Sequence, residues 1–498
     1  MKFIKTYLFA ACVLTTWLGV AHSRAGVVFT NLAFFSYTNP PNYGWNNMPA
    51  GGHTSALVQG NDGDFYGTTC GGGDTVGYDG GGDGTVFQIT PNGALRSLYS
   101  FDTITFELDG RSPEGNLIKG GDGNLYGTTV YGGYIPHIDN GTIYQITTNG
   151  ALTTIYSFGS YGIVSNSFWP DGRFPLAGVT QGNDGNFYGT TSTSGAGQEG
   201  TVFQLTSGGL LNTLHSFTAE DSMTGTNTDG ASPQCELVEG SDGNFYGMTW
   251  EGGAYRCGTI FRIGTDGTFT NLHDFTGIDG SEPNAPLVQG EDGNFYGTTL
   301  TGGGSGTFFQ ITTNGQFTLL YTFNGYNTNP SGLIQGSDGN FYGTTMGGGN
   351  FKGYSSGYGT VFRITTNGAL TTLYSFSGPD GETPQGALVQ AKDGSLYGTT
   401  SYGGSYFDTT RPVNSGYGAI FHIIIPPAFQ TITKINGNAA LSWSIMPGQT
   451  YQVQYCTNLT FASWFNLGSS ITASNATASV TDPIGSNPQR FYRIMLTQ

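Results

Sequence analysis

Five aspartates share one local pattern and are the first candidates for chemistry. Each is followed by glycine and stands just before an apolar run, with proline three residues after the glycine. They are Asp109, Asp171, Asp229, Asp279 and Asp380. If they meet near the mouth of a central channel, such carboxylates could attract a cation or accept hydrogen bonds from the hydroxyls of a sugar. The alternative is five solvated turn residues, and the sequence leaves both interpretations open.

Aromatic residues in glycine-rich stretches are the second set of candidates. Flat rings can stack on the C–H face of a sugar while neighbouring polar groups orient its hydroxyls. The candidates are Trp45, Tyr131, Trp169, Trp250 and Tyr354. The alternative is that glycine-rich loops need aromatic residues to pack on themselves. Together with the five aspartates, these residues form the predicted ligand-binding set.

The other reactive residue types form no motif. His53 and His137 have no serine or cysteine motif around them, and no His/Cys cluster has metal-ligand spacing. We therefore expect no metal and no other cofactor. Paired carboxylates for glycoside cleavage leave no spacing to read, because they come together only in space. A non-catalytic protein is the preferred interpretation, and a polysaccharide-active enzyme is the alternative.

These candidates lie within a tandem repeat whose most regular part is the octet Asp-Gly-Asn-Phe-Tyr-Gly-Thr-Thr at 292–299. Close copies begin at Asp62, Asp122, Asp184, Asp242, Asp292, Asp338 and Asp393. Each copy belongs to a set of four strand-like segments: an apolar run, the octet, a run such as 306–312 and a run such as 316–323. Repeats of four strands predict the blades of a β-propeller.

The turn signals predict which connections share an end of each sheet. Asp-Gly or Asn-Gly stands between the first two segments and between the last two, as in short hairpins. The other connections must then lie at the opposite end, and residues 70–83, 346–358 and 401–417 are among the longest of them. We call that end the loop-rich rim. Variable loops on a rigid scaffold are where binding usually occurs, so we expect function there.

The two ends of the repeat region complement each other. The seventh repeat runs through 418–423 and meets Pro426-Pro427 without a fourth segment. Residues 29–35 align with 269–275, which form a fourth segment, so the N-terminal strand should complete the last blade and cover an open edge. The predicted fold class is all-β: a seven-bladed β-propeller over residues 26–425, closed by the N-terminal strand. Short alternating strands around Trp and Tyr predict a small β-sandwich at 428–498.

The first 25 residues predict export. Lys2 and Lys5 precede an apolar run at 7–20 that is too short for a membrane span, and Ser23-Arg24-Ala25 offers a cleavage site. Removing residues 1–25 takes Lys2, Lys5 and Arg24 from the 16 basic residues, leaving 13 against 33 acidic ones, a net charge of about −20. Such a charge disfavours nucleic acid and anionic membranes. We expect a secreted or cell-surface monomer without membrane insertion.

The cysteines are too scattered for a disulfide framework. Cys12 lies in the predicted signal peptide, and Cys70 and Cys456 lie far apart. Cys235 and Cys257 fall in the same repeat, and export would permit a disulfide between them. Two free thiols are the alternative.

The repeat resembles a known family. The octet, then Gly-Thr-Val-Phe-x-Ile-Thr, then Asn-Gly-Ala-Leu-Thr-Thr-Leu-Tyr-Ser-Phe, is similar to the GloVer tandem repeat of exported bacterial proteins over about residues 27–424. The tail resembles a fibronectin type III-like module. This resemblance implies location and architecture but no activity. We expect a binding or scaffold protein whose loop-rich rim engages a glycan or a cell-surface protein.

Overall fold

The chain folds into β-strands joined by turns and loops. No helix long and apolar enough to cross a membrane occurs in the part of the chain that the structure describes. Every regular element there is a strand. The computed structural model describes residues 12–14, 27–35, 54–73, 82–101, 108–133, 139–159, 169–325, 328–349, 357–392, 394–404, 407–408, 416–425, 429–444, 450–457, 463–472, 477–484 and 490–496.

Twenty-eight of the strands form seven antiparallel sheets of four strands each, one sheet for each octet. The first strands are β3 (Val58–Gln59), β7 (Ile118–Lys119), β11 (Thr180–Gln181), β15 (Val238–Glu239), β19 (Val288–Gln289), β23 (Pro330–Gln335) and β27 (Val389–Gln390). The second strands hold the octets and are β4 (Phe65–Thr69), β8 (Leu125–Thr129), β12 (Phe187–Thr191), β16 (Phe245–Thr249), β20 (Phe295–Thr299), β24 (Phe341–Thr345) and β28 (Leu396–Thr400).

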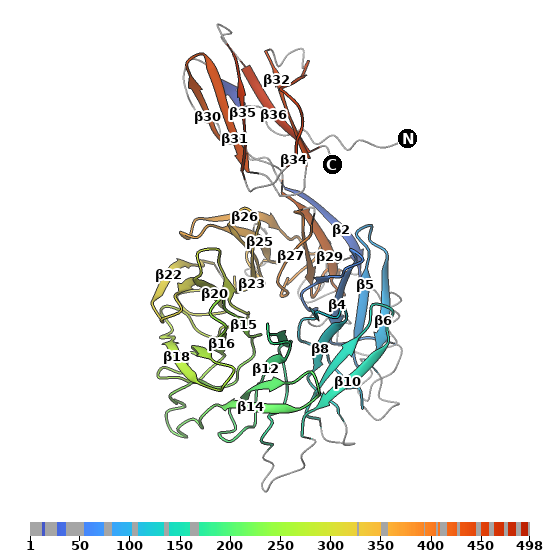
Figure 1. Ribbon diagram of the computed structural model, residues 1–498, viewed down its shortest axis with the longest axis vertical. Coiled ribbons are helices and arrows are strands. Elements are labelled where there is room, and N and C mark those ends of the chain that lie inside the picture. The colour runs from blue at the N-terminus through green and yellow to red at the C-terminus, as the bar shows by residue number, and fades with distance from the viewer. Residues whose placement is uncertain are drawn as a thin grey trace.

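The third and fourth strands complete each sheet. The third strands are β5 (Thr85–Ile89), β9 (Thr142–Ile146), β13 (Thr201–Leu205), β17 (Thr259–Ile263), β21 (Thr307–Ile311), β25 (Thr360–Ile364) and β29 (Ala419–Ile424). The fourth strands are β6 (Leu95–Ser100), β10 (Leu152–Ser157), β14 (Leu211–Ser216), β18 (Phe269–Asp274), β22 (Phe317–Thr322), β26 (Leu370–Ser375) and β2 (Val28–Phe34). Figure 1 shows the fourth strands at the perimeter and the first strands nearer the centre.

The octet folds as it does because its aspartate closes the turn between the first two strands. In the third repeat, Asp184 accepts a hydrogen bond from the Asn186 N–H at 3.0 Å, and Gly185 takes the positive φ of 81° that the turn requires. The Tyr188 hydroxyl donates to the same carboxylate at 2.7 Å and accepts from Gln204 at 2.8 Å. Burial alone would raise the pKa of Asp184, but hydrogen bonds from Tyr188 and Asn186 outweigh it and lower that pKa.

The second half of the octet packs the second strand of each sheet closely against the third strand. Gly189 lies so close to the Phe203 ring that a Cβ atom would come within 2.6 Å of it. The hydroxyls of Thr191 and Thr201 lie 2.8 Å apart across the strand pair and are fully buried. Turn formation and packing therefore explain the octet, and its Asp-Gly pair forms the short hairpin turn that the sequence predicts.

Neighbouring sheets pack face to face through aromatic rings. In five sheet pairs, the octet tyrosine of one sheet lies against the octet phenylalanine of the next, with ring centroids 3.9 to 4.4 Å apart. These pairs are Tyr126–Phe187, Tyr188–Phe245, Tyr246–Phe295, Tyr296–Phe341 and Tyr397–Phe65. The last pair joins the seventh sheet to the first, and both sheets share one core cluster.

The N-terminal strand β2 completes the last sheet. It pairs antiparallel with β29 from Val28 opposite Ile424 to Phe34 opposite Ala419. Phe29 stacks on Tyr374 of the sixth sheet with ring centroids 3.8 Å apart. The strand pairing expected between the two ends of the repeat region is therefore present.

A β-bulge in each fourth strand was not expected. In β26 the register shifts at Leu373, which explains in part why the apolar residues of this segment do not alternate with polar ones. The strand β2 shifts in the same way at Leu32. Gly93 in the first sheet then lies over the Leu32 carbonyl, where a Cβ atom would come within 2.5 Å of the oxygen. The β2 segment thus matches the other fourth strands in detail.

The C-terminal residues form two further sheets that share a core. One contains β30 (Phe429–Ile435), β31 (Asn438–Ser444) and β35 (Thr477–Asp482). The other contains β32 (Thr450–Cys456), β33 (Phe465–Asn466), β34 (Ile471–Thr472), β36 (Arg490–Leu496) and β1 (Cys12–Leu14). Trp443 from the first sheet and Tyr451 and Tyr492 from the second are buried between them. The strand β1, which pairs with β36, lies within the predicted signal peptide. Removal of residues 1–25 would therefore leave this edge of β36 unpaired.

Candidate functional site

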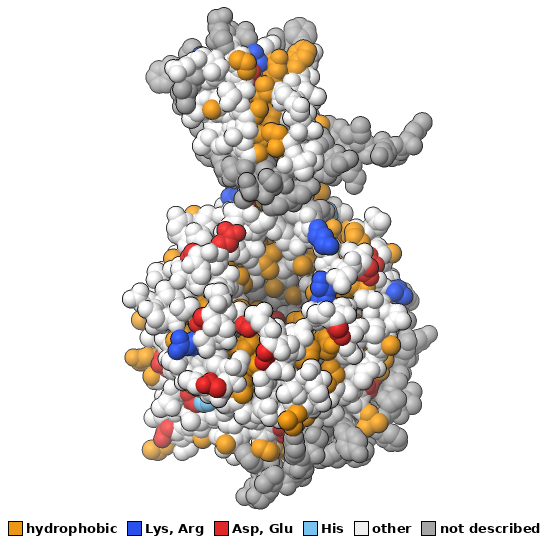
Figure 2. Space-filling model, viewed as in Figure 1, with side chains coloured by type: hydrophobic (Ala, Val, Ile, Leu, Met, Phe, Trp, Pro, Cys, Tyr) orange, Lys and Arg blue, Asp and Glu red, His pale blue; other side chains and the backbone are white. Residues whose placement is uncertain are grey.

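A pocket of about 440 Å³ lies at the centre of the ring of sheets. Figure 2 shows the hollow in the face of the ring. Its lining comes mainly from the residues just before the first strands, and all seven repeats contribute. One equivalent small residue from six of the repeats lines it, namely Ser55, Gly115, Ala177, Cys235, Ala285 and Gly386, and the sixth repeat contributes Gly332 from the next position. Small side chains let the segments approach closely, as at Gly115, where a Cβ atom would come within 2.5 Å of the Gly178 nitrogen.

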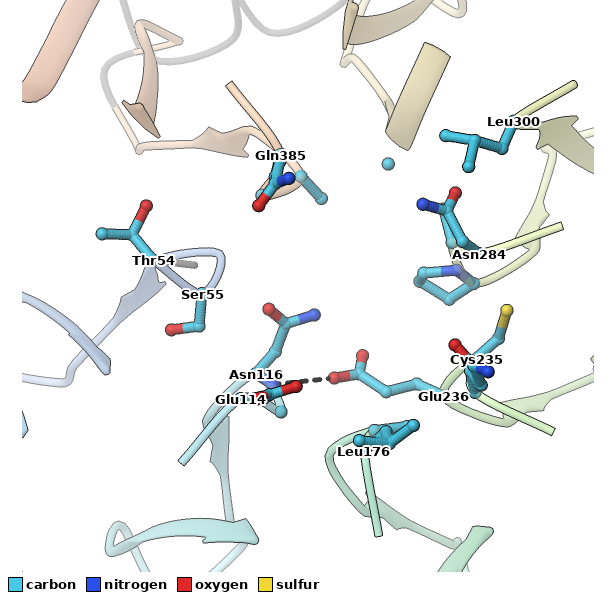
Figure 3. A pocket seen from close by; sticks show the side chains of 18 of the residues that line it. Thr54, Ser55, Glu114, Asn116, Leu176, Cys235, Glu236, Asn284, Leu300 and Gln385 are labelled. Carbon is cyan, nitrogen blue, oxygen red and sulfur yellow. Dashed lines mark hydrogen bonds between the residues drawn. The ribbon is translucent and has the colours of Figure 1, made fainter. Parts of the chain in front are cut away.

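Polar side chains occupy the preceding position of most repeats. We call this set the central polar ring, and it consists of Thr54, Glu114, Gln234, Asn284 and Gln385. Leu176 takes the same place in the third repeat. In Figure 3, Thr54, Glu114, Asn284 and Gln385 surround one common space. Amide and carboxyl groups around one volume can hydrogen-bond a small polar ligand from several sides, whereas the Thr54 hydroxyl itself is buried.

The Glu236 side chain reaches from the fourth repeat to the second. Its carboxylate accepts a hydrogen bond from the Asn116 N–H at 3.2 Å, although the third repeat separates the two in sequence. Gly178 permits this, because a Cβ atom there would come within 2.6 Å of the Glu236 carboxylate oxygen. Asn116 in turn accepts from the Ala56 N–H at 2.7 Å, so one hydrogen-bonded chain joins the first, second and fourth repeats.

The surroundings of Glu236 favour its neutral form. The residue is enclosed by protein atoms, yet its side chain is partly accessible from the pocket. Burial raises the pKa of Glu236, and the hydrogen bonds from Asn116 and Gly178 offset only part of that rise. A carboxyl group of this kind can hold a proton at a pH where exposed glutamates are ionised.

Three larger apolar side chains form the wall of the pocket toward the loop-rich rim. Trp250, Leu300 and Met346 follow directly after the second strands β16, β20 and β24. Trp250 is the predicted aromatic residue that lines the pocket. Its ring offers the flat apolar surface on which a sugar face can stack.

The other predicted aromatic residues lie elsewhere. The Tyr131 ring packs against the Arg111 guanidinium at 4.8 Å, and Trp169 is buried under Arg173 at 4.4 Å. These contacts are of the self-packing kind that the sequence left open. Trp45 and Tyr354 lie outside the described residues.

The five predicted aspartates do not line the central pocket. Each carboxylate instead accepts a hydrogen bond from a side chain of the fourth strand at the perimeter of its preceding sheet. The pairs are Asp109 with Tyr99 at 2.6 Å, Asp171 with Tyr156 at 2.9 Å, Asp229 with His215 at 2.9 Å, Asp279 with His273 at 3.1 Å and Asp380 with Tyr374 at 2.5 Å. The expectation that they gather near the channel mouth is not met, because the perimeter side chains hold them apart.

Through these contacts, each aspartate connects a fourth strand to the loop that follows it. Asp279 also accepts from the backbone N–H and the hydroxyl of Thr276, both at 2.8 Å. Asp380 bonds Ser377 in the same way. No group of three or more His, Cys, Asp or Glu side chains suited to a metal ion occurs among the described residues. Within that part of the chain, Cys235 and Cys257 are free thiols and not a disulfide.

Sequence reasoning missed the residues that do line the pocket, Glu114, Asn116 and Glu236 above all. A signal for them existed. When the repeats are aligned on the leucine or valine before each first strand, the preceding position reads Ala56, Asn116, Gly178, Glu236, Pro286, Gly332 and Ala387. A glutamate among mostly small residues stands out once that position is known to face the centre.

The fold and the site define an all-β tandem-repeat protein whose propeller-like sheets surround a central pocket. The model of the Gloeobacter/Verrucomicrobia repeat matches residues 21–228 and 222–412, so the chain belongs to this family. The tandem-repeat resemblance found in the sequence is thereby confirmed, while the fibronectin type III-like character of the tail stays a prediction. None of the curated proteins compared with the chain matches it.

Several solved structures align with the chain at low identity and low TM-score. One is a 6-phosphogluconolactonase candidate from Bacteroides uniformis, 15% identical, with 81% of this chain and 96% of that chain covered and a TM-score of 0.41. Another is a luciferin-regenerating enzyme, 12% identical over 80% and 96%, with a TM-score of 0.37. A gluconolactonase from Xanthomonas campestris is 11% identical over 61% and 82%, with a TM-score of 0.36. Similarity at this level assigns no activity to the chain.

Proposed function

We propose that the chain is an exported, non-catalytic binding protein that holds a saccharide in its central pocket. Its seven sheets are the blades of one closed β-propeller over residues 26–425, and residues 428–498 form a fibronectin type III-like module. The pairing of β2 with β29 and the core shared by the first and seventh sheets support closure. The basic and apolar pattern of residues 1–25 supports export.

The lining of the pocket carries the proposal. Saccharides are recognised by several directed hydrogen bonds together with one flat apolar contact. The central polar ring supplies the first and Trp250 supplies the second. The volume of about 440 Å³ lies within the usual range for small-ligand pockets. The ligand would enter from the loop-rich rim, where binding was expected.

A glycan array probed with the protein tests the proposal, because it samples many saccharides at once. Trp250→Ala should abolish or strongly weaken the binding, since it removes the stacking surface. Tyr131→Ala is the matched control, because Tyr131 is a predicted aromatic residue that packs on Arg111 outside the pocket. Equal binding by both variants would count against the pocket. Binding to surface proteins with no saccharide signal would favour a scaffold role instead.

A polysaccharide-active enzyme is the second candidate, and one observation favours it. Glu114 and Glu236 both line the pocket, and burial raises the pKa of Glu236. A protonated carboxyl and an ionised one on either side of a glycosidic bond are what glycoside hydrolysis needs. This candidate predicts turnover of a bound oligosaccharide that is lost in both Glu114→Gln and Glu236→Gln. Binding without turnover in the unmodified protein would exclude it for that ligand.

A further inference from the structure

We propose that the central pocket selects a ligand that carries a protonated amine, so that within the saccharides it favours an amino sugar with a free amino group. The inference rests on the proposed function, because it names the ligand class of the same pocket. It follows from the charges of the lining, from the absence of a competing cation there, and from the hydrogen bonds that Glu236 makes.

The lining is one-sided in charge. Glu114 and Glu236 are its charged side chains, and no Lys, Arg or His occurs among the described residues that line it. Two basic side chains of nearby loops are bound elsewhere: Arg111 pairs with Asp139 at 2.8 Å, and Arg173 lies over Trp169. A phosphate or carboxylate on a ligand would therefore meet two carboxyl groups and no counter-charge from the described residues of the lining. An ammonium group would meet two carboxyl groups and the oxygens of the neighbouring amides.

An amine fits this site better than a metal ion does. The described residues contain no group of three or more candidate metal-ligating side chains, and the two glutamates are interspersed with amides. Calcium needs six to eight oxygen ligands. An ammonium needs only about three acceptors, which the oxygens of the Glu114 and Glu236 carboxyl groups can supply. Trp250 adds an aromatic face that attracts cations as well as sugar C–H groups.

Glu236 is held in position without using up its capacity to accept. One carboxylate oxygen takes the Asn116 N–H, and Figure 3 shows the other directed away from that bond. The titratable groups that face Glu236 in the lining are Glu114 and the Cys235 thiol, whose pKa burial raises. Neither supplies a positive charge. A bound ammonium would stabilise the ionised form of Glu236, so binding should release a proton from it.

Three disaccharides that differ at one position test the inference by isothermal titration calorimetry. They are the chitosan disaccharide with free amines, its N-acetylated counterpart and cellobiose. We expect the free amine to bind about tenfold more tightly than the other two, because a charge-assisted hydrogen bond replaces a neutral one. Its affinity should rise with pH as Glu236 ionises, up to the pH at which the amine itself loses its proton. Cellobiose binding should show no such rise.

The variant Glu236→Gln separates charge from shape. The glutamine oxygen can still accept from the Asn116 N–H, so the fold should persist while the tenfold preference for the free amine over cellobiose disappears. If all three disaccharides bind the unmodified protein equally, the amine inference fails and the saccharide pocket stands. If none binds but 1,4-diaminobutane does, the amine inference stands and the saccharide fails. If neither class binds, both proposals fail.

Discussion

The substitution Phe35→Ala tests whether the N-terminal strand closes the ring. Phe35 follows β2 and is 1% exposed in the core between the seventh and first sheets. Its ring lies edge-on to Phe87 at 5.4 Å, and its N–H donates to the Gly418 carbonyl at 3.1 Å. Removing a buried phenylalanine ring costs about 3–5 kcal/mol when the surroundings cannot collapse into the space. We expect that cost here only if β2 is firmly bound.

Phe217→Ala is the matched control for this experiment. Phe217 has the same repeat position after β14, is fully buried and lies edge-on to Phe261 at 5.5 Å. It belongs to an internal sheet whose four strands are continuous in sequence, so its cost does not depend on closure. In a closed ring the two substitutions should destabilise by similar amounts, about 3–5 kcal/mol each.

Equilibrium unfolding in guanidinium chloride measures both variants, provided that the denaturant slope stays constant. Hydrogen exchange supplies an independent readout, because the amides of β2 should be protected as well as those of β18. If β2 detached readily, Phe35→Ala would cost less than about 0.5 kcal/mol while Phe217→Ala kept its full cost. That result, together with fast exchange in β2, would refute the closed ring.

Three further predictions follow from single contacts. Gly178→Ala should cost about 1–3 kcal/mol in urea unfolding and weaken ligand binding in calorimetry, because its Cβ would come within 2.4 Å of the Asn116 carbonyl oxygen. Gly208→Ala should change neither, because its Cβ would meet only the Thr206 hydroxyl, in ordinary contact at 3.8 Å. Tyr188→Phe should cost about 1–3 kcal/mol in urea unfolding and raise the pKa of Asp184 in an NMR titration, because the carboxylate loses a donor. Burial lowers the pKa of His273, and Asp279 offsets part of that shift. The contribution of His273 to stability should therefore fall as the pH drops below the unfolded pKa of about 6.5. His273→Tyr should weaken the pH dependence of the thermal midpoint in that range, and an unchanged pH dependence would contradict the prediction.

Much of the ring was predictable because the octet repeats local rules. Asp-Gly-Asn predicts the turn, and the turn of the third repeat is built by Asp184 and Gly185 as expected. The missing fourth segment after 423 and the orphan segment at 29–35 predicted the pairing of β2 with β29. The bulge at Leu32 was not predictable, because it depends on how a fourth strand fits against the next sheet. No local preference of leucine specifies such a fit.

The site was harder to predict, since its residues meet only after the ring has formed. Aspartates such as Asp229 and Asp279 recur because each repeat needs the same structural contact. Asp229 hydrogen-bonds His215, and Asp279 hydrogen-bonds His273. Trp250 and Trp169 were both predicted to bind ligand from loops of similar composition, yet Trp250 lines the central pocket and Trp169 is buried in self-packing. Sequence alone cannot separate the two, because exposure depends on the neighbouring loop.

A repeat protein shows its individual function where its repeats differ at equivalent positions. The residues that build the sheets, such as the octet tyrosines, are nearly the same in every repeat because every sheet must solve the same packing problem. The position before each first strand faces the centre and does not pack between neighbouring sheets, so its residue type differs from repeat to repeat. There Asn116, Gly178 and Glu236 stand in consecutive repeats, and each depends on the others: the glycine leaves room for the glutamate to reach the backbone of Asn116. The sheets are therefore repeated with little change, whereas the residues that face the centre differ from repeat to repeat and together form a single contact.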